Sequence, residues 1–403
     1  MARPREITGG SKAHDMTAPA WRVIVPVRYS RSVPMEAVRI LFVITDLKVG
    51  GVPLHLLRLA TALDRRRFSV AVVSLADIGP VGERLLRAGI PVGACEAAGP
   101  WDARALGRLY AYIRARRPDI LHSLLFHANV ACRLVGPAAG IPIRRILCEI
   151  QTAEYERPWH LSLDGATVRL CRLEIGNSPS VIRHLYRRAH IPHRRLRLIE
   201  GGVDVGAIAA AGPADRAALG VSPDTSLVLW VGRLDPVKGL DELVDAAKLV
   251  RQGGGRAVFL LAGAGGYEPA LRRRITSTGA EEYVRLLGRR DDVASLLKAA
   301  DVFAFPSRTE GLPNALMEAM AAGAAIVTTD AAGCRDLVRN EQTGLVVRVG
   351  DTPALAAAIR RLLADRALRE RLGAAAAAFA RDRCSWTKAV ARYTELYEEV
   401  AGR

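Results

Sequence analysis

The sequence predicts an α/β protein with two parallel, doubly wound sheets that face each other across a cleft. Short apolar runs alternate with amphipathic stretches from Arg39 onward, and the same alternation begins again after residues 201–204. Strands that alternate with helices in this way form parallel sheets covered by helices. The chain has 403 residues, half of them apolar, which is enough for two domains with separate cores.

The first half contains short apolar runs that are bounded by turn residues. They predict strands at 39–45, 68–75, 119–124, 143–150 and 172–178. Apolar residues recur with helical spacing at 54–63 and 104–117, and arginines edge the apolar face of the second stretch.

The second half repeats the pattern. Its apolar runs predict strands at 226–232, 257–263, 284–288, 301–307 and 325–330. A helix is expected at 240–250, and a long amphipathic helix at 384–400 ends the chain. Ligands bind at the carboxyl ends of parallel strands, so the cleft between the two sheets is the expected site.

These patterns predict two Rossmann-like domains, at 39–205 and 206–384, followed by a C-terminal helical segment at 385–403. Residues 1–38 show no useful helical or strand period and are predicted to be a disordered extension. An additional strand at 21–27 is the alternative for this segment.

The net charge of +17 is concentrated in the predicted first domain, where residues 39–205 carry a net charge of +11. A basic domain attracts nucleic acid, an anionic membrane or a phosphorylated substrate, although a solvated basic surface is the simpler interpretation. The arginine-rich stretches 104–117 and 183–197 allow the same two interpretations, a membrane-facing helix or a solvated helix face. Few aromatic residues are interleaved with them, which argues against a nucleic-acid surface.

The six cysteines are far apart and form no C-x-x-C pair, which indicates small core residues of a reduced, cytoplasmic protein. No apolar run approaches the roughly 18 residues that span a bilayer, and no signal peptide is visible.

Two glutamates, Glu310 and Glu318, form the clearest constellation. Glu310 follows a predicted strand and a Pro-Ser turn, Gly311 allows close backbone approach, and Pro313 suits the first turn of a helix. The amino end of that helix favours a diphosphate, and the carboxylates are suited to sugar hydroxyls. Two solvated glutamates beside an ordinary helix cap are the alternative.

Two further loops follow predicted strands. Gly232 permits a sharp exit from the strand before it, and Arg233 and Lys238 then place two cations on one loop, where they would neutralise a leaving diphosphate. Ordinary surface cations are the alternative.

Gly50 and Gly51 follow the first strand and resemble half of a dinucleotide fingerprint. The full G-x-G-x-x-G pattern is absent, however, and a simple turn explains the two glycines equally well.

Together these segments resemble glycosyltransferase family 4, which has the GT-B fold. The resemblance covers roughly 39–400 and is strongest in VGRLDPVKG, LLGRRDD, DVFAFPSRTEGLPNALMEAMAAG and LVRNEQTGLVV. It implies that the C-terminal helix crosses back to the first domain. It also implies transfer with retention of anomeric configuration and without a divalent metal or other cofactor, and the sequence indeed contains no D-x-D pair.

The resemblance assigns roles to individual residues. Glu318 would bind the ribose hydroxyls, Glu310 the transferred sugar, and Arg233 and Lys238 the diphosphate. The remaining donor-side positions are backbone or base-pocket contacts, namely Gly50, Gly51, Gly232, Gly263, Gly265, Gly288, Arg289, Gly311, Leu312 and Asn314.

The cleft histidine is ambiguous. Members of the family with an H-x-H motif have a histidine two residues after the position of His122, where this chain has Leu124. We expect His127 to take the catalytic position, with His122 as the other candidate, and a buried core histidine is the alternative interpretation for both. Gly201 replaces the asparagine that often precedes the glycine of the interdomain loop.

The predicted function is transfer of a hexosyl-type residue from a nucleotide sugar to a hydroxyl of a glycan or lipid-linked acceptor in polysaccharide or glycoconjugate synthesis. The enzyme would work in the cytoplasm, at the inner face of the plasma membrane if the basic first domain binds anionic lipid. The alternatives are another GT-B enzyme, such as a nucleotide-sugar epimerase, and a basic nucleic-acid-binding protein.

Overall fold

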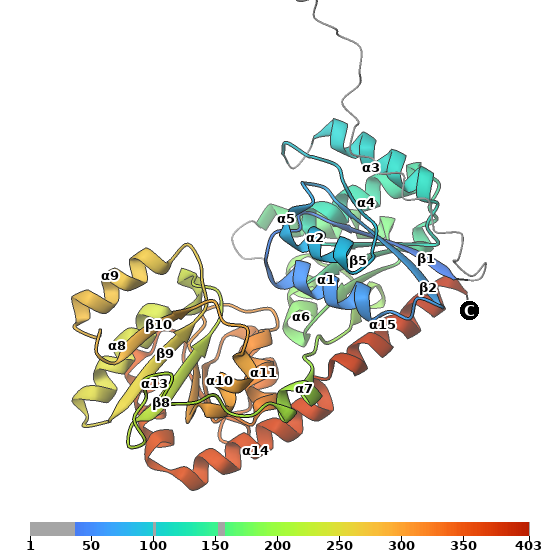
Figure 1. Cartoon of the computed structure of the whole chain (residues 1–403). Helices are drawn as coiled ribbons and strands as arrows, with labels where there is room; N and C mark the ends of the chain where they lie inside the picture. The colour runs from blue at the N-terminus through green and yellow to red at the C-terminus, as the bar shows by residue number, and fades with distance from the viewer. Residues whose placement is uncertain (1–36, 100–101, 152–157, 403) are drawn as a thin grey trace, which may run out of the picture.

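The computed structural model describes residues 37–99, 102–151 and 158–402, which form two α/β domains (Figure 1). The predicted strand at 21–27 and nearly all of the predicted extension 1–38 lie outside the described residues. The first described strand begins at Val38, one residue before the predicted start.

In the described part of the first domain, seven parallel strands have the order β3-β2-β1-β4-β5-β6-β7. The strands are β1 Val38–Ile44, β2 Phe68–Ser74, β3 Val92–Ala94, β4 Ile120–Leu124, β5 Ile146–Ile150, β6 Leu173–Gly176 and β7 Leu196–Leu198. The helices are α1 Gly51–Ala62, α2 Gly79–Arg87, α3 Ala103–Arg116, α4 Phe126–Ala138, α5 Pro158–Thr167 and α6 Pro179–Arg188.

Strand β1 shows how this sheet is covered on both faces. Its residues Ile40 and Phe42 point into a core shared with α1, α2 and the C-terminal helix, whereas Leu41 and Val43 point into a core shared with α3, α4 and α6. Because both faces are buried, the strand is a continuous apolar run, as parallel strands of doubly wound sheets usually are.

The second domain repeats the arrangement, with the strand order β10-β9-β8-β11-β12-β13 among the residues described. Its strands are β8 Ser226–Val231, β9 Ala257–Ala262, β10 Val284–Gly288, β11 Val302–Phe305, β12 Ile326–Thr329 and β13 Leu345–Val347. The short helix α7 Val205–Ala210 precedes the first of these strands. The other helices are α8 Leu240–Gln252, α9 Glu268–Thr278, α10 Val293–Ala299, α11 Asn314–Ala322, α12 Ala332–Leu337, α13 Thr352–Ala364 and α14 Arg366–Arg383.

The C-terminal helix α15, Trp386–Ala401, returns to the first domain (Figure 1). Its buried residues Tyr393, Leu396 and Tyr397 belong to the core of the first sheet. The chain therefore passes between the domains twice, and the two passages pair with each other through hydrogen bonds of 2.9 Å from Val203 N to Cys384 O and from Trp386 N to Val203 O. The expected return of this helix is confirmed.

Three strands, β3, β7 and β13, were not predicted. Each has only three residues and lies at an edge of its sheet, so none contains an apolar run long enough to stand out. The basic stretch 183–197 is not one helix: it comprises the end of α6, a 3-10 turn at His193–Arg195 and the edge strand β7. Within the described residues, no helix is long and apolar enough to cross a membrane.

The first domain also buries an ionic cluster around Arg133 of α4, whose side chain has no exposed surface. Its guanidinium donates to Asp164 Oδ1 over 2.6 Å, to Thr167 Oγ1 over 2.9 Å and to Glu174 Oε2. Cys148 and Cys171 lie beside Glu174. All six cysteines are buried free thiols, as predicted for small core residues.

Candidate active site

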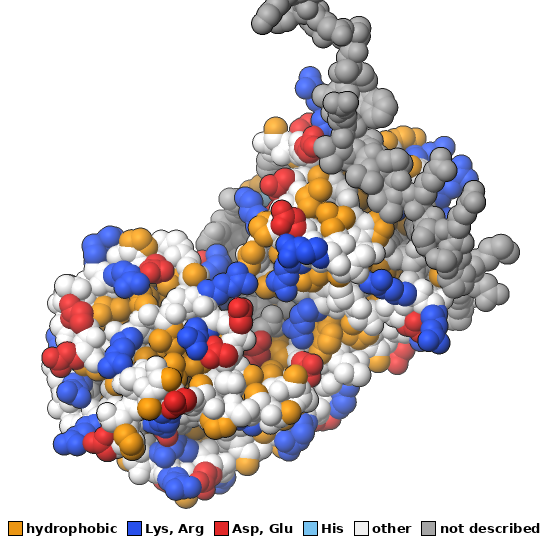
Figure 2. Space-filling view, viewed as in Figure 1, with side chains coloured by type: hydrophobic (Ala, Val, Ile, Leu, Met, Phe, Trp, Pro, Cys, Tyr) orange, Lys and Arg blue, Asp and Glu red, His pale blue; other side chains and the backbone are white. Residues whose placement is uncertain are grey.

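A cavity of about 840 Å³ lies between the two domains, which appear as two lobes in Figure 2. In the second domain it lies beyond β8 and β11, the neighbouring strands at which the strand order reverses, and this is the ligand-binding position of doubly wound sheets. Residues of both domains line it: Gly51, Val52, Leu54, His55, Arg58, Gln151, Asn177, Gly201, Gly202, Val231, Gly232, Arg233, Asp235, Val237, Lys238, Phe305, Thr309, Glu310, Gly311, Leu312, Pro313, Asn314, Ala315 and Glu318.

Lys238 and Glu310 form an ion pair in this cavity, with 2.7 Å between Lys238 Nζ and Glu310 Oε1. Lys238 ends a 3-10 turn after β8, and Glu310 follows β11, with 9% of its surface exposed. Gly239 has a φ of +66°, and a Cβ there would lie 2.1 Å from the carbonyl oxygen of Pro306. This glycine therefore lets the two loops approach closely enough for the pair to form.

Arg233 lies on the same loop as Lys238 and pairs with Asp235 over 2.9 Å. Its side chain remains 65% exposed, so the guanidinium is accessible to an anion in the cavity. The two loop cations predicted from the sequence therefore line one cavity together with Glu310.

Glu318 lies in the second turn of α11, with its side chain half-buried at the cavity. Burial raises the pKa of this carboxyl to about 7, and the charge of Arg58 counteracts that rise. Pro313 precedes the helix and no side chain caps it, so the first backbone N–H groups have no side-chain acceptor. Gly311, Leu312 and Asn314 line the cavity beside them.

The first domain contributes His55 and Arg58 from α1, the helix that begins at Gly51 with Gly50 as its N-cap. His55 Nε2 lies 3.5 Å from Glu149 Oε1 and 3.3 Å from the hydroxyl of Tyr393. Burial lowers the pKa of His55, while the charge of Glu149 opposes the effect. His55 is therefore the histidine that lines the interdomain cavity in the described chain.

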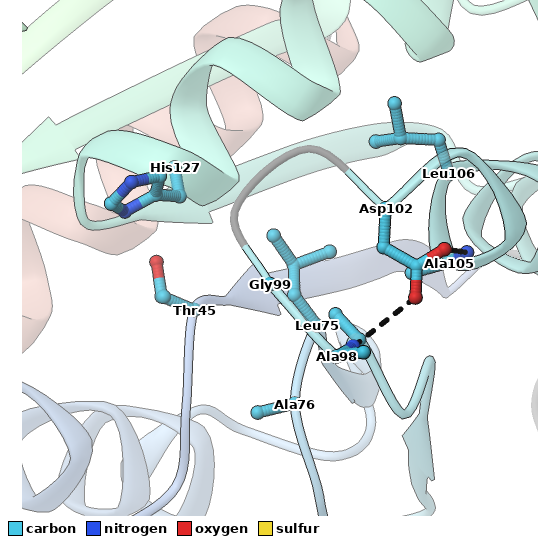
Figure 3. A pocket seen from close by; sticks show the side chains of 10 residues that line it. Thr45, Leu75, Ala76, Ala98, Gly99, Asp102, Ala105, Leu106 and His127 are labelled. Atoms are coloured by element: carbon cyan, nitrogen blue, oxygen red, sulfur yellow. Dashed lines mark hydrogen bonds between the residues drawn. The ribbon is translucent and has the colours of Figure 1, made fainter.

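His122 and His127 occupy other positions. His122 is completely buried, with Nδ1 2.8 Å from the Tyr397 hydroxyl and Nε2 3.2 Å from Glu149 Oε2. His127, at the start of α4, lines a separate pocket of about 220 Å³ in the first domain (Figure 3). Beside this pocket, Asp102 Oδ2 accepts a hydrogen bond of 3.1 Å from Ala98 N. The catalytic role expected of His127 stays a prediction.

Gly263 and Gly265 hold the loop after β8 in place. A Cβ at Gly263 would lie 1.8 Å from the carbonyl oxygen of Gly232, and one at Gly265 would lie 2.1 Å from that of Leu234. Gly263 N in turn donates to Gly288 O over 2.8 Å. Gly263, Gly265, Gly288 and Arg289 do not line the interdomain cavity, so their contact with a base stays a prediction.

The geometry agrees with comparisons of the sequence. Residues 49–206 match the family model described as Glycosyltransferase Family 4, and residues 225–365 match the one described as Glycosyl transferases group 1. The chain belongs to glycosyltransferase family 4.

Similar glycosyltransferases include two with named donors. A UDP-Gal:alpha-D-GlcNAc-diphosphoundecaprenol alpha-1,3-galactosyltransferase of Escherichia coli is 27% identical over 66% of this chain and 72% of its own length. A GDP-mannose-dependent monoacylated alpha-(1-6)-phosphatidylinositol monomannoside mannosyltransferase of Corynebacterium glutamicum is 33% identical over 53% of this chain. That alignment spans 58% of the mannosyltransferase.

The fold is shared with solved structures. Anabaena HepE in complex with UDP has a TM-score of 0.80 at 24% identity, over 90% of this chain and all of that one. Sucrose-phosphate synthase from Thermosynechococcus elongatus has a TM-score of 0.75 at 20% identity, over 90% of this chain and 99% of its own. The described domains therefore form a GT-B glycosyltransferase fold.

Four polar side chains that the first domain contributes to the cavity, His55, Arg58, Gln151 and Asn177, were not predicted from the sequence. A local signal existed for two of them: His55 and Arg58 follow Gly51 at spacings of four and seven, which places all three on one face of α1. Gln151 and Asn177 lie at the carboxyl ends of β5 and β6, the sheet edge where doubly wound folds bind ligands, but no spacing rule distinguishes them from other residues at that edge.

Proposed function

We propose that this family 4 glycosyltransferase transfers a sugar from a nucleotide sugar to an acceptor hydroxyl with retention of configuration. The observation that carries the proposal is the convergence of Arg233, Lys238, Glu310 and Glu318 on one interdomain cavity. Cations beside carboxylates suit a ligand that combines a diphosphate with sugar hydroxyls. A nucleic-acid-binding module would not need the carboxylates.

In the reaction, the bond between the anomeric carbon and the diphosphate oxygen breaks, and a bond from the acceptor oxygen forms on the same face. The acceptor proton passes to an oxygen of the departing diphosphate. Arg233 and Lys238 stabilise the negative charge that develops there, and Glu310 orients the sugar. This division of labour requires no strong protein base.

We further propose that these cations take the place of a divalent metal. Among the described residues one group has the composition of a metal site, Cys148, Cys171 and Glu174, but it is buried in the first domain and Arg133 already pairs with Glu174. A cation there would lie beside a guanidinium, which is electrostatically unfavourable.

The donor is tested by a thermal-shift and hydrolysis screen with UDP-, GDP-, ADP- and TDP-sugars, each with and without EDTA. We expect one nucleotide class to stabilise the protein, because cavity groups bind only the folded state. Glu318→Ala should abolish that shift, EDTA should leave it unchanged, and Glu282→Ala, an exposed carboxylate of the same domain, should retain it.

The screen also has outcomes that contradict the proposal. Stabilisation that survives Glu318→Ala would place the nucleotide elsewhere, and a shift that EDTA removes would require a metal. No response to any nucleotide, combined with salt-sensitive binding to nucleic acid, would favour the binding-protein alternative. Conversion of a UDP-sugar into its epimer without transfer would favour the epimerase.

For the acceptor, we propose a glycan or lipid-linked hydroxyl presented at an anionic membrane. The E. coli relative is named for a diphosphoundecaprenol acceptor and the Corynebacterium relative for a phosphatidylinositol mannoside. In this chain, α3 exposes Arg104 and Arg114 together with Tyr110, which is 42% exposed. Basic and aromatic side chains on one helix suit an anionic bilayer surface.

Replacing Arg104 and Arg114 together by serine should weaken binding to phosphatidylglycerol vesicles about thirtyfold at low salt, since each basic residue contributes about 1 kcal/mol. Vesicle sedimentation measures this. Arg273 and Arg381, two exposed arginines of the second domain, provide the matched control pair. Equal losses for both pairs would indicate general charge attraction, and no vesicle binding by the unmodified protein would end the membrane proposal.

A further inference from the structure

Arg58 brings a positive charge from the first domain to the cavity that contains Glu318. Its guanidinium carbon lies 4.4 Å from the centroid of the Trp386 ring, a cation–π contact. Trp386 is the first residue of α15 and is hydrogen-bonded to Val203 of the other interdomain passage. The Arg58 side chain is therefore held at the point where the two domains join.

Arg58 differs from the other basic side chains of the cavity in its partners. Arg233 pairs with Asp235, and Lys238 pairs with Glu310. Within residues 37–99, 102–151 and 158–402, no carboxylate forms an ion pair with Arg58. The carboxylates that interact with its charge are Glu318 and Asp204. Glu318 lines the cavity from the second domain, and Asp204 follows Val203 in the passage between the domains.

Few charged groups affect the ionisation of the Glu318 carboxyl. Its pKa is raised to about 7 by burial, and Arg58 is the charged group that opposes this rise. Asp204 caps α7, and the Lys238–Glu310 and Arg233–Asp235 pairs neutralise themselves. The elements α10, α12 and α14 also pack on α11, but none of their charged side chains shifts the pKa of Glu318: Lys298, Arg335, Asp336, Arg366, Arg369, Glu370, Arg371, Arg381, Asp382 and Arg383.

We propose that Arg58 is a positioning residue for Glu318, so that a charge supplied by the first domain strengthens nucleotide binding by the second at neutral pH. The inference rests on the function proposed above, in which Glu318 accepts hydrogen bonds from the ribose hydroxyls. A carboxylate accepts from both hydroxyls, whereas a protonated carboxyl becomes a donor at one oxygen. Arg58 keeps Glu318 in the accepting form without touching the nucleotide.

The pH dependence follows from this arrangement. Nucleotide affinity should be full above the pKa of Glu318 and should fall as the pH drops through about 7. Removing the charge of Arg58 moves that transition to higher pH, by about one unit for a neighbouring opposite charge. At pH 7 the ionised fraction of Glu318 then falls about fivefold, while at pH 8.5 it changes less than about twofold.

Calorimetric titration with UDP-glucose, and with GDP-mannose in parallel, between pH 6 and 8.5 tests the inference. The diphosphate diester of a nucleotide sugar does not titrate in this range. We expect Arg58→Gln to bind about fivefold more weakly at pH 7 and within about twofold of the unmodified protein at pH 8.5. Arg58→Lys should restore the profile, and Arg66→Gln, which removes an exposed arginine that follows α1, should not change it.

A double-mutant cycle separates the possible roles of Arg58. In a Glu318→Gln background, Arg58→Gln should have no further effect at any pH. A loss that is equal at all pH values and persists in that background would show direct contact of Arg58 with phosphate and overturn the inference, as would an unchanged profile. If the unmodified protein bound neither nucleotide sugar, the proposed function would fail first and this inference with it.

Discussion

Replacing Lys238 by alanine should lower kcat by about two to three orders of magnitude, the usual effect of removing one preorganised group that stabilises charge in a transition state. Lys238 lies in the cavity with only 17% of its side chain exposed, and Glu310 holds its ammonium group 2.7 Å from Oε1. The charge is therefore fixed before the reaction begins. Negative charge grows on the leaving diphosphate during transfer, so kcat should fall more than donor affinity.

Steady-state kinetics with saturating donor measure this effect. Lys248→Ala is the matched control, because Lys248 is exposed on α8. Lys238→Arg should retain part of the activity, since it keeps the charge but changes its shape. Loss of donor affinity alone, with kcat within threefold of the unmodified enzyme, would show that Lys238 binds the ground state and does not stabilise the transition state.

Replacing Arg133 by methionine should reduce the free energy of unfolding by about 3–5 kcal/mol, the typical cost of leaving buried charges without their partner. The side chains of Asp164 and Glu174 are almost or completely buried and both pair with Arg133. Urea unfolding followed by circular dichroism measures the loss. Arg144→Met, a change at an exposed arginine of the same domain, is the control.

The destabilisation should depend on pH. Burial already raises the pKa of Asp164, and Arg133 opposes that rise. Without the guanidinium, the folded-state pKa of Asp164 lies further above its unfolded value, so stability is lost as the pH rises through that interval. The variant should therefore be less impaired at pH 5 than at pH 8. A deficit independent of pH would mean that lost packing, and not uncompensated charge, is the main cost.

Much of the second domain was predictable because its signals are local. The strands β8, β9 and β11 are apolar runs, and Arg233, Lys238 and Glu310 follow such runs within a few residues. In a parallel sheet, loops after neighbouring strands lie at one edge, so strand order alone brings these side chains together. The edge strands β3, β7 and β13 lacked a comparable signal, because three residues do not establish a period.

The histidines show where local signals stop. The sequence analysis gave His127 and His122 as candidates for the cleft histidine. In the structure His122 is buried in the first domain, and His127 lines a separate pocket. His55 lines the interdomain cavity because Glu149 of β5 and Tyr393 of α15 pack against α1. These partners lie 94 and 338 residues away from it in the chain, and no spacing rule relates them.

The sequence by itself determined the two doubly wound domains, the family and the charged loops of the second domain, because periodicity and loop chemistry depend on neighbouring residues. Only the tertiary structure decided that His55 faces the cavity, that Arg133 is buried and that Arg58 lies opposite Glu318. Those contacts join residues from different elements or domains. Their geometry depends on how α15 returns to the first sheet and how the two interdomain passages pair at Val203 and Trp386.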